Sequence, residues 1–432
     1  MATPQLGADV KRILVGNTLS ALGRGFTLPF LFIYFTDVRD ISVATSGLLI
    51  ASTGVWGFLV VPLGGTLIDR IGSWWVLLLS LVLAAVGTVW LGFVQGAGEA
   101  FAALAVMSIG MGLSWPAQSA LVASIVPPRL RPRAFASQFA LLNLGIGLGG
   151  AVSGLLVDVD RVSTFQLIYI VDALSFLVYA AVLLSVRHVG RSPEAPAPDD
   201  TEPRTGYLRL LQDRTFVLFA LLSLVLMTAG YAQIESGLPA FVTDSAGVST
   251  RTLGFGFAAN TAVIVLGQLL VQRRLQGHRR THALAGAAVI MAGSWVLIGT
   301  AALLDGRVQP AIAVMAGMAV FGMGETLLAP TNPVIVNDLA PPHLRGRYNA
   351  AFSFVWNVGA VLGPVLAGVL LELGLDAIYI GSLIGGCLLF ALLMVRFERR
   401  LTPEQNGVFD DPSLPGPTVE TPLGPAVTGP VA

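Results

Sequence analysis

Twelve long apolar stretches follow one another along this 432-residue chain and leave little room for any other architecture. Eight of them contain no Asp, Glu, Lys or Arg, and the other four contain one charge each: Arg24, Asp172, Glu235 or Glu325. A membrane-crossing helix needs about 20 consecutive apolar residues, whereas a membrane strand needs about half as many. The sequence therefore predicts an all-α, polytopic membrane protein with twelve transmembrane helices. The expected spans are Ile13–Thr36, Ile41–Ile68, Ile71–Gly98, Ala100–Pro128, Ala134–Val157, Thr164–Val186, Phe216–Val242, Thr252–Gln272, Thr281–Leu304, Val308–Val336, Tyr348–Leu371 and Ala377–Val395.

The composition excludes several classes of protein. Charged residues make up 12% of the chain, against about 25% in a soluble domain, which argues against a soluble enzyme, a disordered chain and a nucleic-acid-binding protein. The single cysteine, Cys387, and the four histidines, which lie in polar loops or at their edges, offer neither a disulfide framework nor a metal site. No nucleotide-binding loop or nucleophile–base pair is visible, so we expect no cofactor and no catalysis.

The basic residues predict the orientation in the membrane. If the N-terminus lies in the cytoplasm, 20 Lys and Arg residues fall on the cytoplasmic side and 4 on the other, with Arg24 inside the membrane. Cytoplasmic loops carry such an excess of basic residues. We therefore expect a multi-pass protein of the cell membrane with both termini in the cytoplasm.

The chain divides into two halves, a linker and a tail. Residues 188–214 are polar, charged and contain proline, so they are expected to form a flexible cytoplasmic linker between an N-terminal half, residues 1–187, and a C-terminal half, residues 215–400. Residues 401–432 contain 7 prolines and few aliphatic clusters, which predicts a disordered cytoplasmic tail.

The two halves repeat each other at a fixed offset of 214 residues. Two polar positions, Arg131 and Arg133, match Arg345 and Arg347, and Pro116 matches Pro330. The offset continues without a gap through three glycine pairs: Gly145 with Gly359, Gly149 with Gly363, and Gly154 with Gly368. The repeat predicts two pseudo-symmetric six-helix bundles, and parallel repeats of this kind are typical of transporters with a binding site between the halves.

A second motif lies between the second and third spans, where Gly65, Asp69, Arg70 and Gly72 form the pattern G-x-x-x-D-R-x-G. Together with the repeat, this motif resembles the major facilitator superfamily over about residues 12–400. The resemblance implies a cytoplasmic gate built from these four residues and from the basic positions Arg131, Arg133, Arg345 and Arg347. It also implies that Asp69 lies near the start of the eleventh helix, around Arg347–Ala351. The corresponding loop of the second half, GQLLVQRRLQGHRR, lacks the aspartate, so we expect an asymmetric and weaker gate.

The fifth helix resembles the glycine-rich motif of drug:proton antiporters in the same family, with Gly145, Gly149 and Gly154 in register. The motif's Gly-Pro pair stands in the second half, at Gly363 and Pro364, near Gly359. The arginine that such antiporters often carry on the fourth helix is missing. The resemblance favours export, and all of these glycines also suit close packing of membrane helices.

Polar residues at membrane depth are the candidates for the transport pathway, because they are costly there. The resemblance implies that helices 1, 4, 7 and 10 line the central cavity. Arg24 and Asn17 fall on helix 1, Gln118 on helix 4, Tyr231, Gln233 and Glu235 on helix 7, and Glu325 and Asn332 on helix 10. Arg24 suits a structural cation equally well, and Asp172 on helix 6 is expected to be a structural hydrogen-bond partner. Trp115 and Trp356 suit packing or the wall of an apolar cavity.

These features predict a monomeric secondary transporter that works by alternating access in the lipid bilayer. The favoured mechanism is proton-coupled efflux of small amphipathic compounds, with Glu235 as the first candidate for the proton carrier and Glu325 as the second. One alternative is an importer or facilitator of a small metabolite. The other is a membrane receptor or accessory subunit that does not transport.

Overall fold

The computed structural model describes residues 6–189, 207–274 and 278–408, and these residues form an all-helical protein. The N-terminal half contains six long segments, counted in chain order. They are the broken first helix α1(Ala8–Thr27), η1(Leu28–Phe30), α2(Leu31–Ile33) and η2(Tyr34–Val38), then α3(Val43–Ile71), α4(Ser73–Leu91), α5(Ala97–Ile125), α6(Arg131–Leu156) with η3(Pro128–Leu130) before it, and α7(Val162–Ser185).

The C-terminal half repeats this plan. Its six segments are the broken seventh helix α9(Arg214–Leu226), η4(Met227–Tyr231), α10(Ala232–Glu235), α11(Gly237–Ala240) and η5(Phe241–Ser245), then α12(Thr250–Arg274), α13(Arg280–Thr300) with η6(Ala301–Leu303), α14(Val308–Leu339), α15(Arg345–Glu372) after η7(Pro342–Leu344), and α16(Asp376–Phe397) with η8(Glu398–Arg400).

The prediction of twelve transmembrane helices agrees with this architecture. Within the described residues, eleven segments are long and apolar enough to cross a membrane, and α12 adds a shorter apolar stretch, Thr252–Gln268. The first and seventh helices are both interrupted next to a Leu-Pro pair, Leu28-Pro29 and Leu238-Pro239. Proline removes a backbone donor and disturbs the preceding turn, which explains breaks at these equivalent places.

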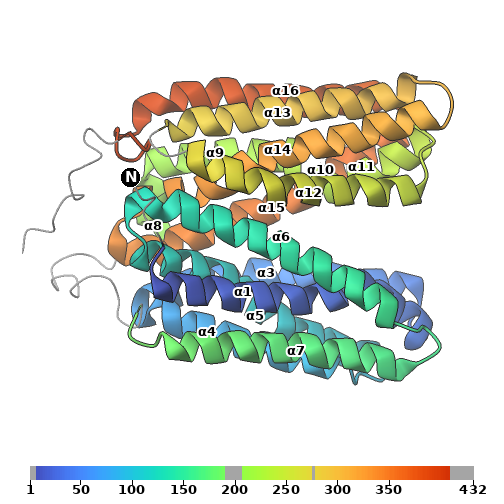
Figure 1. Cartoon of the computed structure of the whole chain (residues 1–432), viewed down its shortest axis with the longest axis horizontal. Coiled ribbons are helices and arrows are strands. Elements are labelled where there is room, and N and C mark those ends of the chain that lie inside the picture. The colour runs from blue at the N-terminus through green and yellow to red at the C-terminus, as the bar shows by residue number, and fades with distance from the viewer. Residues whose placement is uncertain (1–5, 190–206, 275–277, 409–432) are drawn as a thin grey trace, which may run out of the picture.

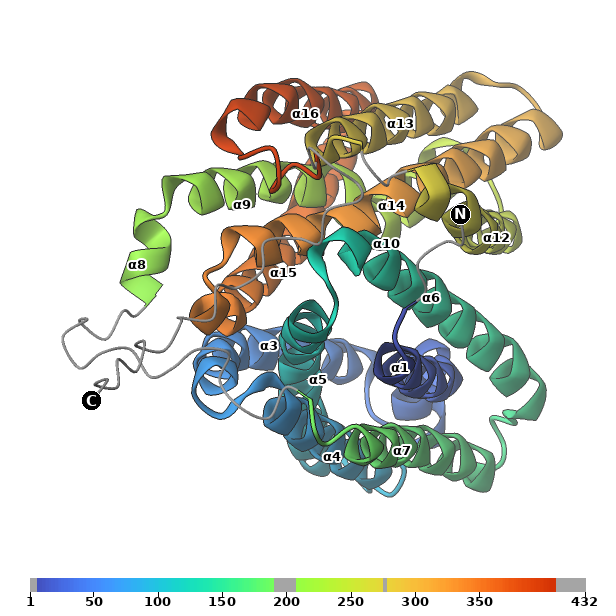
Figure 2. The same cartoon turned by 60° about the vertical axis from the view of Figure 1, so that its left-hand side comes forward.

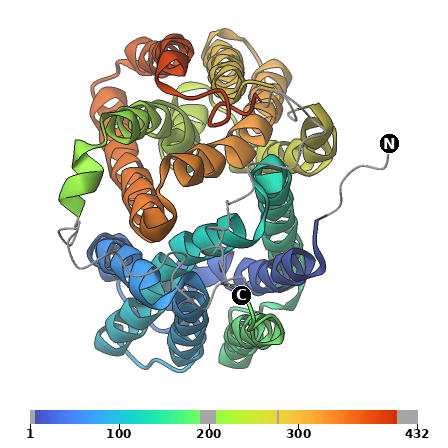
Figure 3. The same cartoon turned by 90° about the vertical axis from the view of Figure 1, so that its left-hand side faces the viewer.

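The helices form two bundles, one from each half (Figure 1). The N-terminal half lies below in this view and the C-terminal half above, and each has its own buried hydrophobic core. We call the end of the molecule that carries Arg187–Val189 and α8(Tyr207–Gln212) the linker end. It is on the left in Figure 1 and faces the viewer in Figure 3, where the two bundles meet along one line.

Glycines at repeated positions bring helices together in the same way in both halves. A Cβ atom on Gly149 of α6 would lie 2.9 Å from the Cα atom of Gly25 on α1 and would collide with the carbonyl of Leu22. A Cβ atom on its counterpart Gly363 in α15 would lie 2.5 Å from the Cβ atom of Ala232 in α10. The helix α1 therefore packs closely against α6, and its equivalent α10 packs closely against α15.

Two further glycine pairs complete this comparison. A Cβ atom on Gly145 would lie 2.8 Å from Ala21, and one on Gly359 would lie 2.7 Å from Met227. Nothing lies within 4 Å of the corresponding position on Gly154 or on its counterpart Gly368. Pro364 lies inside α15 directly after Gly363.

The segments around the linker and the tail are partly ordered. In the linker, α8 begins at Tyr207 and is set at the side of the molecule in Figure 2, while residues 190–206 are outside the described part of the chain. Asp213 accepts hydrogen bonds from the backbone of Thr215 and Phe216 and so caps α9.

The tail was expected to be disordered from Leu401, but residues 401–408 form turns packed on the C-terminal half. Residues 409–432 are outside the described residues.

Candidate gate and transport pathway

Asp69 joins the two halves at the linker end. It lies in the last turn of α3, and its carboxylate accepts hydrogen bonds from the backbone N–H groups of Gly346 at 2.7 Å and Arg347 at 3.2 Å. The Arg347 guanidinium Nε lies 3.6 Å from the same carboxylate, whose side chain is 6% exposed. The first N–H groups of a helix have no partner within the helix and carry partial positive charge. A carboxylate in this place therefore closes α3 of one half onto the start of α15 of the other.

Two glycines make this approach possible. A Cβ atom on Gly65 would lie 2.6 Å from the Cβ atom of Ala350, and one on Gly346 would lie 2.5 Å from the Asp69 carboxylate. Gly72 ends α3 with φ = 94°, a conformation that residues with a side chain rarely adopt. The four motif residues therefore have separate roles: Gly65 allows the close approach, Asp69 makes the contact, Gly72 ends the helix, and Arg70 is exposed.

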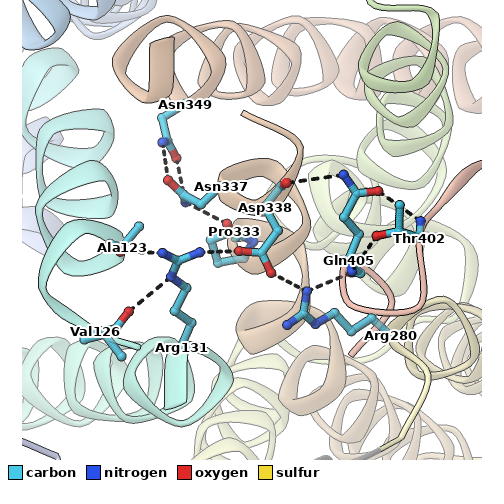
Figure 4. Close-up of polar contacts among 10 residues, drawn as sticks. All are labelled: Ala123, Val126, Arg131, Arg280, Pro333, Asn337, Asp338, Asn349, Thr402 and Gln405. Atoms are coloured by element: carbon cyan, nitrogen blue, oxygen red, sulfur yellow. Dashed lines mark hydrogen bonds and ion pairs between the residues drawn. The ribbon is translucent and has the colours of Figure 1, made fainter. Parts of the chain in front are cut away.

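A second contact between the halves is centred on Asp338, near the end of α14 (Figure 4). One carboxylate oxygen forms an ion pair with Arg131 at the start of α6, and the other lies 2.6 Å from Arg280 at the start of α13. Arg131 also donates to the backbone carbonyls of Val126 at 3.2 Å and Ala123 at 2.8 Å. All three charged side chains are nearly buried, so the carboxylate lies between two guanidinium groups from different halves.

The two contacts hold equivalent helices, although their carboxylates come from helices that are not equivalent in the repeat. Asp69 holds the start of α15, and Asp338 holds the start of α6, which is the equivalent helix in the other half. The loop after α12 has no aspartate, which predicts an asymmetric and weaker gate. The second carboxylate comes instead from the end of α14, where the repeat has Ser124 in the first half and Asp338 in the second. This difference between Ser124 and Asp338 at equivalent positions is the sequence feature that could have indicated the second contact.

The other basic residues of the expected gate surround these contacts. Arg133 and Arg345 are partly buried at the starts of α6 and α15. The backbone carbonyl of Arg345 accepts a hydrogen bond from Asn349, whose amide also pairs with Asn337 of α14 at 2.8 Å. The start of α15 is thereby tied to the end of α14, beside Asp338 (Figure 4).

The linker region adds a contact with the N-terminal half. The Tyr207 hydroxyl at the start of α8 donates to the backbone carbonyl of Pro62 in α3. Burial raises the pKa of Tyr207 to about 12, so its hydroxyl remains protonated near neutral pH.

Aromatic residues contact one another towards the middle of the membrane. Phe58 of α3 and Phe354 of α15 meet edge to face across the halves, with ring centroids 5.1 Å apart. On the C-terminal side, Tyr231 packs against Trp356 with ring centroids 4.6 Å apart. Trp115 of α5 is 45% exposed in this structure, so part of its indole is open to contact with another molecule.

Arg24 and Asp172 lie close together on neighbouring helices. Asp172 of α7 is buried, accepts a hydrogen bond of 2.7 Å from the Thr27 hydroxyl of α1, and interacts electrostatically with Arg24. The hydrogen bond agrees with the expected role of Asp172 as a structural partner. The Arg24 side chain is exposed, so the charge of the first helix is open to contact while its neighbouring carboxylate is not.

The two glutamates of the expected pathway differ. Glu325 of α14 is 6% exposed and accepts a hydrogen bond of 2.8 Å from the Asn260 amide of α12, which also donates to the carbonyl of Met318. Glu235 ends α10 just before the break at Ser236, but its side chain is outside the described residues. The structure therefore places Glu325 against α12 and gives only the backbone position of Glu235.

The amide residues fall into two groups. Gln233 is fully buried, donates to the carbonyls of Thr228 and Gly363, and accepts a hydrogen bond from Tyr379, so its contacts lie inside the C-terminal half. Asn17, Gln118 and Asn332 are also buried, but each has one amide atom that bonds to no described residue. Gln118 and Asn332 both lie seven residues before the ends of their helices, about 10 Å from the linker end.

Within the described residues, no group of His, Cys, Asp or Glu side chains is arranged to hold a metal ion. The arrangement instead suits reversible mechanical closure. Each half has a hydrophobic core of its own, with Val334 of α14 packed into the N-terminal one, and hydrogen bonds and ion pairs join the halves at the linker end.

Residues 13–306 and 297–429 of the chain match the family described as the Major Facilitator Superfamily. The chain is 26% identical to the MFS-type transporter YqjV of Bacillus subtilis (strain 168) over 401 residues, which cover 90% of this chain and 93% of the relative. It is 23% identical to the quinolone resistance protein NorA of Staphylococcus aureus (strain COL) over 396 residues, with 89% and 96% covered. The solved structure of a bacterial homologue of the iron transporter ferroportin, in an outward-facing state, shares the fold with a TM-score of 0.74 at 15% identity, covering 91% of this chain and 100% of that one.

Proposed function

The chain belongs to the Major Facilitator Superfamily, and on that premise we propose that it exports small amphipathic compounds in exchange for protons, by alternating access of a central site. The family is one of transporters, so the protein is a multi-pass membrane transporter rather than an enzyme. The expected partners are the lipid bilayer, a small-molecule substrate and protons, with the protein acting as a monomer.

The observation that carries this proposal is the pair of related contacts at the linker end. Asp69 and Asp338 each hold the start of a helix from the opposite half. Both contacts are polar, and both lie outside the hydrophobic cores of the halves. Rocking of one half against the other would break them without unfolding either half, which is the motion that alternating access requires.

The orientation follows from the basic residues. By the count from the sequence, 20 Lys and Arg residues fall on the side of the linker and 4 on the other side, which supports a cytoplasmic location for the linker end and a place in the cell membrane. The closed linker end then corresponds to a state whose site is shut towards the cytoplasm. The likeness in fold to a transporter in an outward-facing state is in keeping with this assignment.

The substrate class and direction rest on the aromatic residues and on the relatives. Trp115 is 45% exposed, and Trp356, which packs against Tyr231, lies on α15, the helix that contacts α3 of the other half, so flat apolar groups would pack there. One relative is named as a quinolone resistance protein, which favours export of compounds of this kind. Asn17, Gln118 and Asn332 offer amide groups for the polar part of such a compound.

Proton coupling rests on two carboxylates, Glu235 of α10 and Glu325 of α14. Ionisable groups inside a membrane are costly and are kept where they serve transport. Glu325 is nearly buried beside the Asn260 amide, and Glu235 lies at the break of the seventh helix. We assign Glu235 as the first candidate for the proton carrier and Glu325 as the second. Arg24 is the cation that competes with the substrate or the proton for the Glu235 carboxylate.

The proposal is tested with purified protein in liposomes under an imposed pH gradient, using a fluorescent amphipathic cation such as ethidium as the probe. Uphill movement of the probe that depends on the gradient supports antiport. Movement that is insensitive to the gradient would indicate a facilitator, and binding without movement would indicate a receptor.

A further inference from the structure

The first eight residues after η8 turn back onto the linker end of the C-terminal half. Thr402 and Gln405 bond to each other reciprocally: the Thr402 N–H donates to the Gln405 side chain at 3.0 Å, and the Gln405 N–H donates to the Thr402 hydroxyl at 3.2 Å. This is the capping-box arrangement that begins a helical turn, with Pro403 in its favoured first position. The turn is therefore specified by its own residues, T-P-E-Q, and has a defined shape.

The turn ends in a second set of contacts, which cap α13. The side-chain oxygen of Asn406 accepts hydrogen bonds from the backbone N–H of Thr281 at 3.0 Å and from its hydroxyl at 3.2 Å. The Asn406 carbonyl accepts from the N–H of Arg280 at 2.9 Å. No side chain of the helix's own N-cap residue makes this bond. Asn406 is 4% exposed, so these contacts are shielded from water.

The turn also positions the charged residues of the gate (Figure 4). The Arg280 guanidinium donates to the Gln405 carbonyl at 2.7 Å and to the Asp338 carboxylate at 2.6 Å. The Gln405 amide donates to the backbone carbonyl of Asp338 at 3.4 Å. Gly407 has φ = +82°, and a Cβ atom on it would lie 3.2 Å from Arg280, so the chain passes closely over that side chain.

We infer that the segment Leu401–Val408 is a built-in latch, which fixes Arg280 and through it aims the Asp338 carboxylate at Arg131 of the other half. Arg280 holds one carboxylate oxygen and thereby leaves the other to face Arg131. Undocking of the segment removes one hydrogen-bond acceptor from Arg280 and the N-cap from α13. The carboxylate then loses its fixed orientation, and the linker end opens more often. The inference rests on the proposed alternating access, because the latch acts on one of the two access states.

Two truncations separate the latch from the rest of the tail. One chain ends at Val408 and keeps every contact described above, whereas the other ends at Arg400 and loses all of them. The reporter is Ser353→Cys, a near-isosteric change on α15 two turns beyond Gly346 on the face that meets α3. Native Cys387, which is fully buried, serves as an internal measure of global unfolding. The rate of labelling by N-ethylmaleimide is measured for both cysteines in purified protein.

We expect the chain that ends at Arg400 to label at Ser353→Cys several-fold faster than the full chain, and the chain that ends at Val408 to match the full chain. Cys387 should label equally slowly in all three. Equal rates at Ser353→Cys in the two truncated chains would overturn the latch. A parallel rise at Cys387 would do the same, since the segment would then serve only folding.

Two point variants in the full chain keep the inference testable if the shorter chain does not fold. Asn406→Ala removes the acceptor and should raise labelling at Ser353→Cys, whereas Asn406→Asp keeps an acceptor suited to a helix N-terminus and should restore the original rate. Labelling of Asn406→Ala at the rate of the unchanged protein would contradict the latch. The assay contains neither substrate nor pH gradient, so its outcome is independent of whether the protein exports drugs.

Discussion

Asp338 of α14 forms an ion pair with Arg131 of α6, and this pair joins the two halves where the linker end closes. Arg280 lies 2.6 Å from the other oxygen of the same carboxylate. The carboxylate therefore separates two nearly buried guanidinium groups that would otherwise face each other.

Replacing this carboxylate should destabilise the closed state more than replacing one whose basic partners are exposed. Removing one partner of a buried ion pair costs about 3–5 kcal/mol, so Asp338→Asn should lower the midpoint of thermal unfolding or open the linker end to labelling. Glu398→Gln is the matched control, because Glu398 also contacts two basic side chains, Arg279 and His282, but both are more than half exposed. Exposed pairs contribute about 0–1 kcal/mol. Equal effects of the two substitutions would contradict the role given to Asp338.

Asp69→Asn should impair transport while leaving expression nearly unchanged. The asparagine loses the negative charge that faces the N–H groups of Gly346 and Arg347 and presents a donor to one of them. Hydrogen bonds to a charged group contribute about 1.5–3 kcal/mol, enough to shift the balance between the two access states. The initial rate of uptake into liposomes measures the effect, with Asp9→Asn as a control on a carboxylate at the same end that is 32% exposed and pairs with residues of its own half. Full transport by Asp69→Asn would remove the gate role.

The sequence allowed the architecture and the position of Asp69 at the start of α15 to be predicted. Run length fixes the spans because bilayer thickness is constant, and the G-x-x-x-D-R-x-G motif marks Asp69 because its glycines and carboxylate are local in sequence. Asp338 and Arg280 were missed because their pairing joins residues from α6, α13 and α14, which only the fold brings together. The latch was missed for another reason. Its T-P-E-Q signal is a capping box, but the proline content of the surrounding tail indicated disorder.

The repeated glycines give a prediction about packing. In Gly149→Ala the new methyl group would collide with the backbone of α1 at Leu22 and Gly25, whereas in Gly154→Ala it meets nothing within 4 Å. Both substitutions change helix propensity alike, so the difference between them measures the collision. Overpacking costs about 1–3 kcal/mol, and the midpoint of thermal unfolding in detergent should fall for Gly149→Ala only. A similar fall for Gly154→Ala would show that close approach of α1 is not the cause.

The orientation is tested with single cysteines at the two ends of the molecule. His188→Cys lies at the linker end and Asp305→Cys in the exposed loop before α14, while native Cys387 is buried and out of reach of the reagent. A membrane-impermeant maleimide added to intact cells should label Asp305→Cys and spare His188→Cys until the cells are opened. Labelling of both positions in intact cells would contradict the assigned topology.

The most direct test of proton-coupled export uses the double variant Glu235→Gln, Glu325→Gln in liposomes. These substitutions keep the size and hydrogen-bonding ability of the side chains but remove the groups assigned to carry protons. Substrate counterflow without a gradient should survive, because it needs only alternating access, while uphill transport driven by a pH gradient should disappear. Uphill transport that persists in the double variant would contradict coupling through either glutamate.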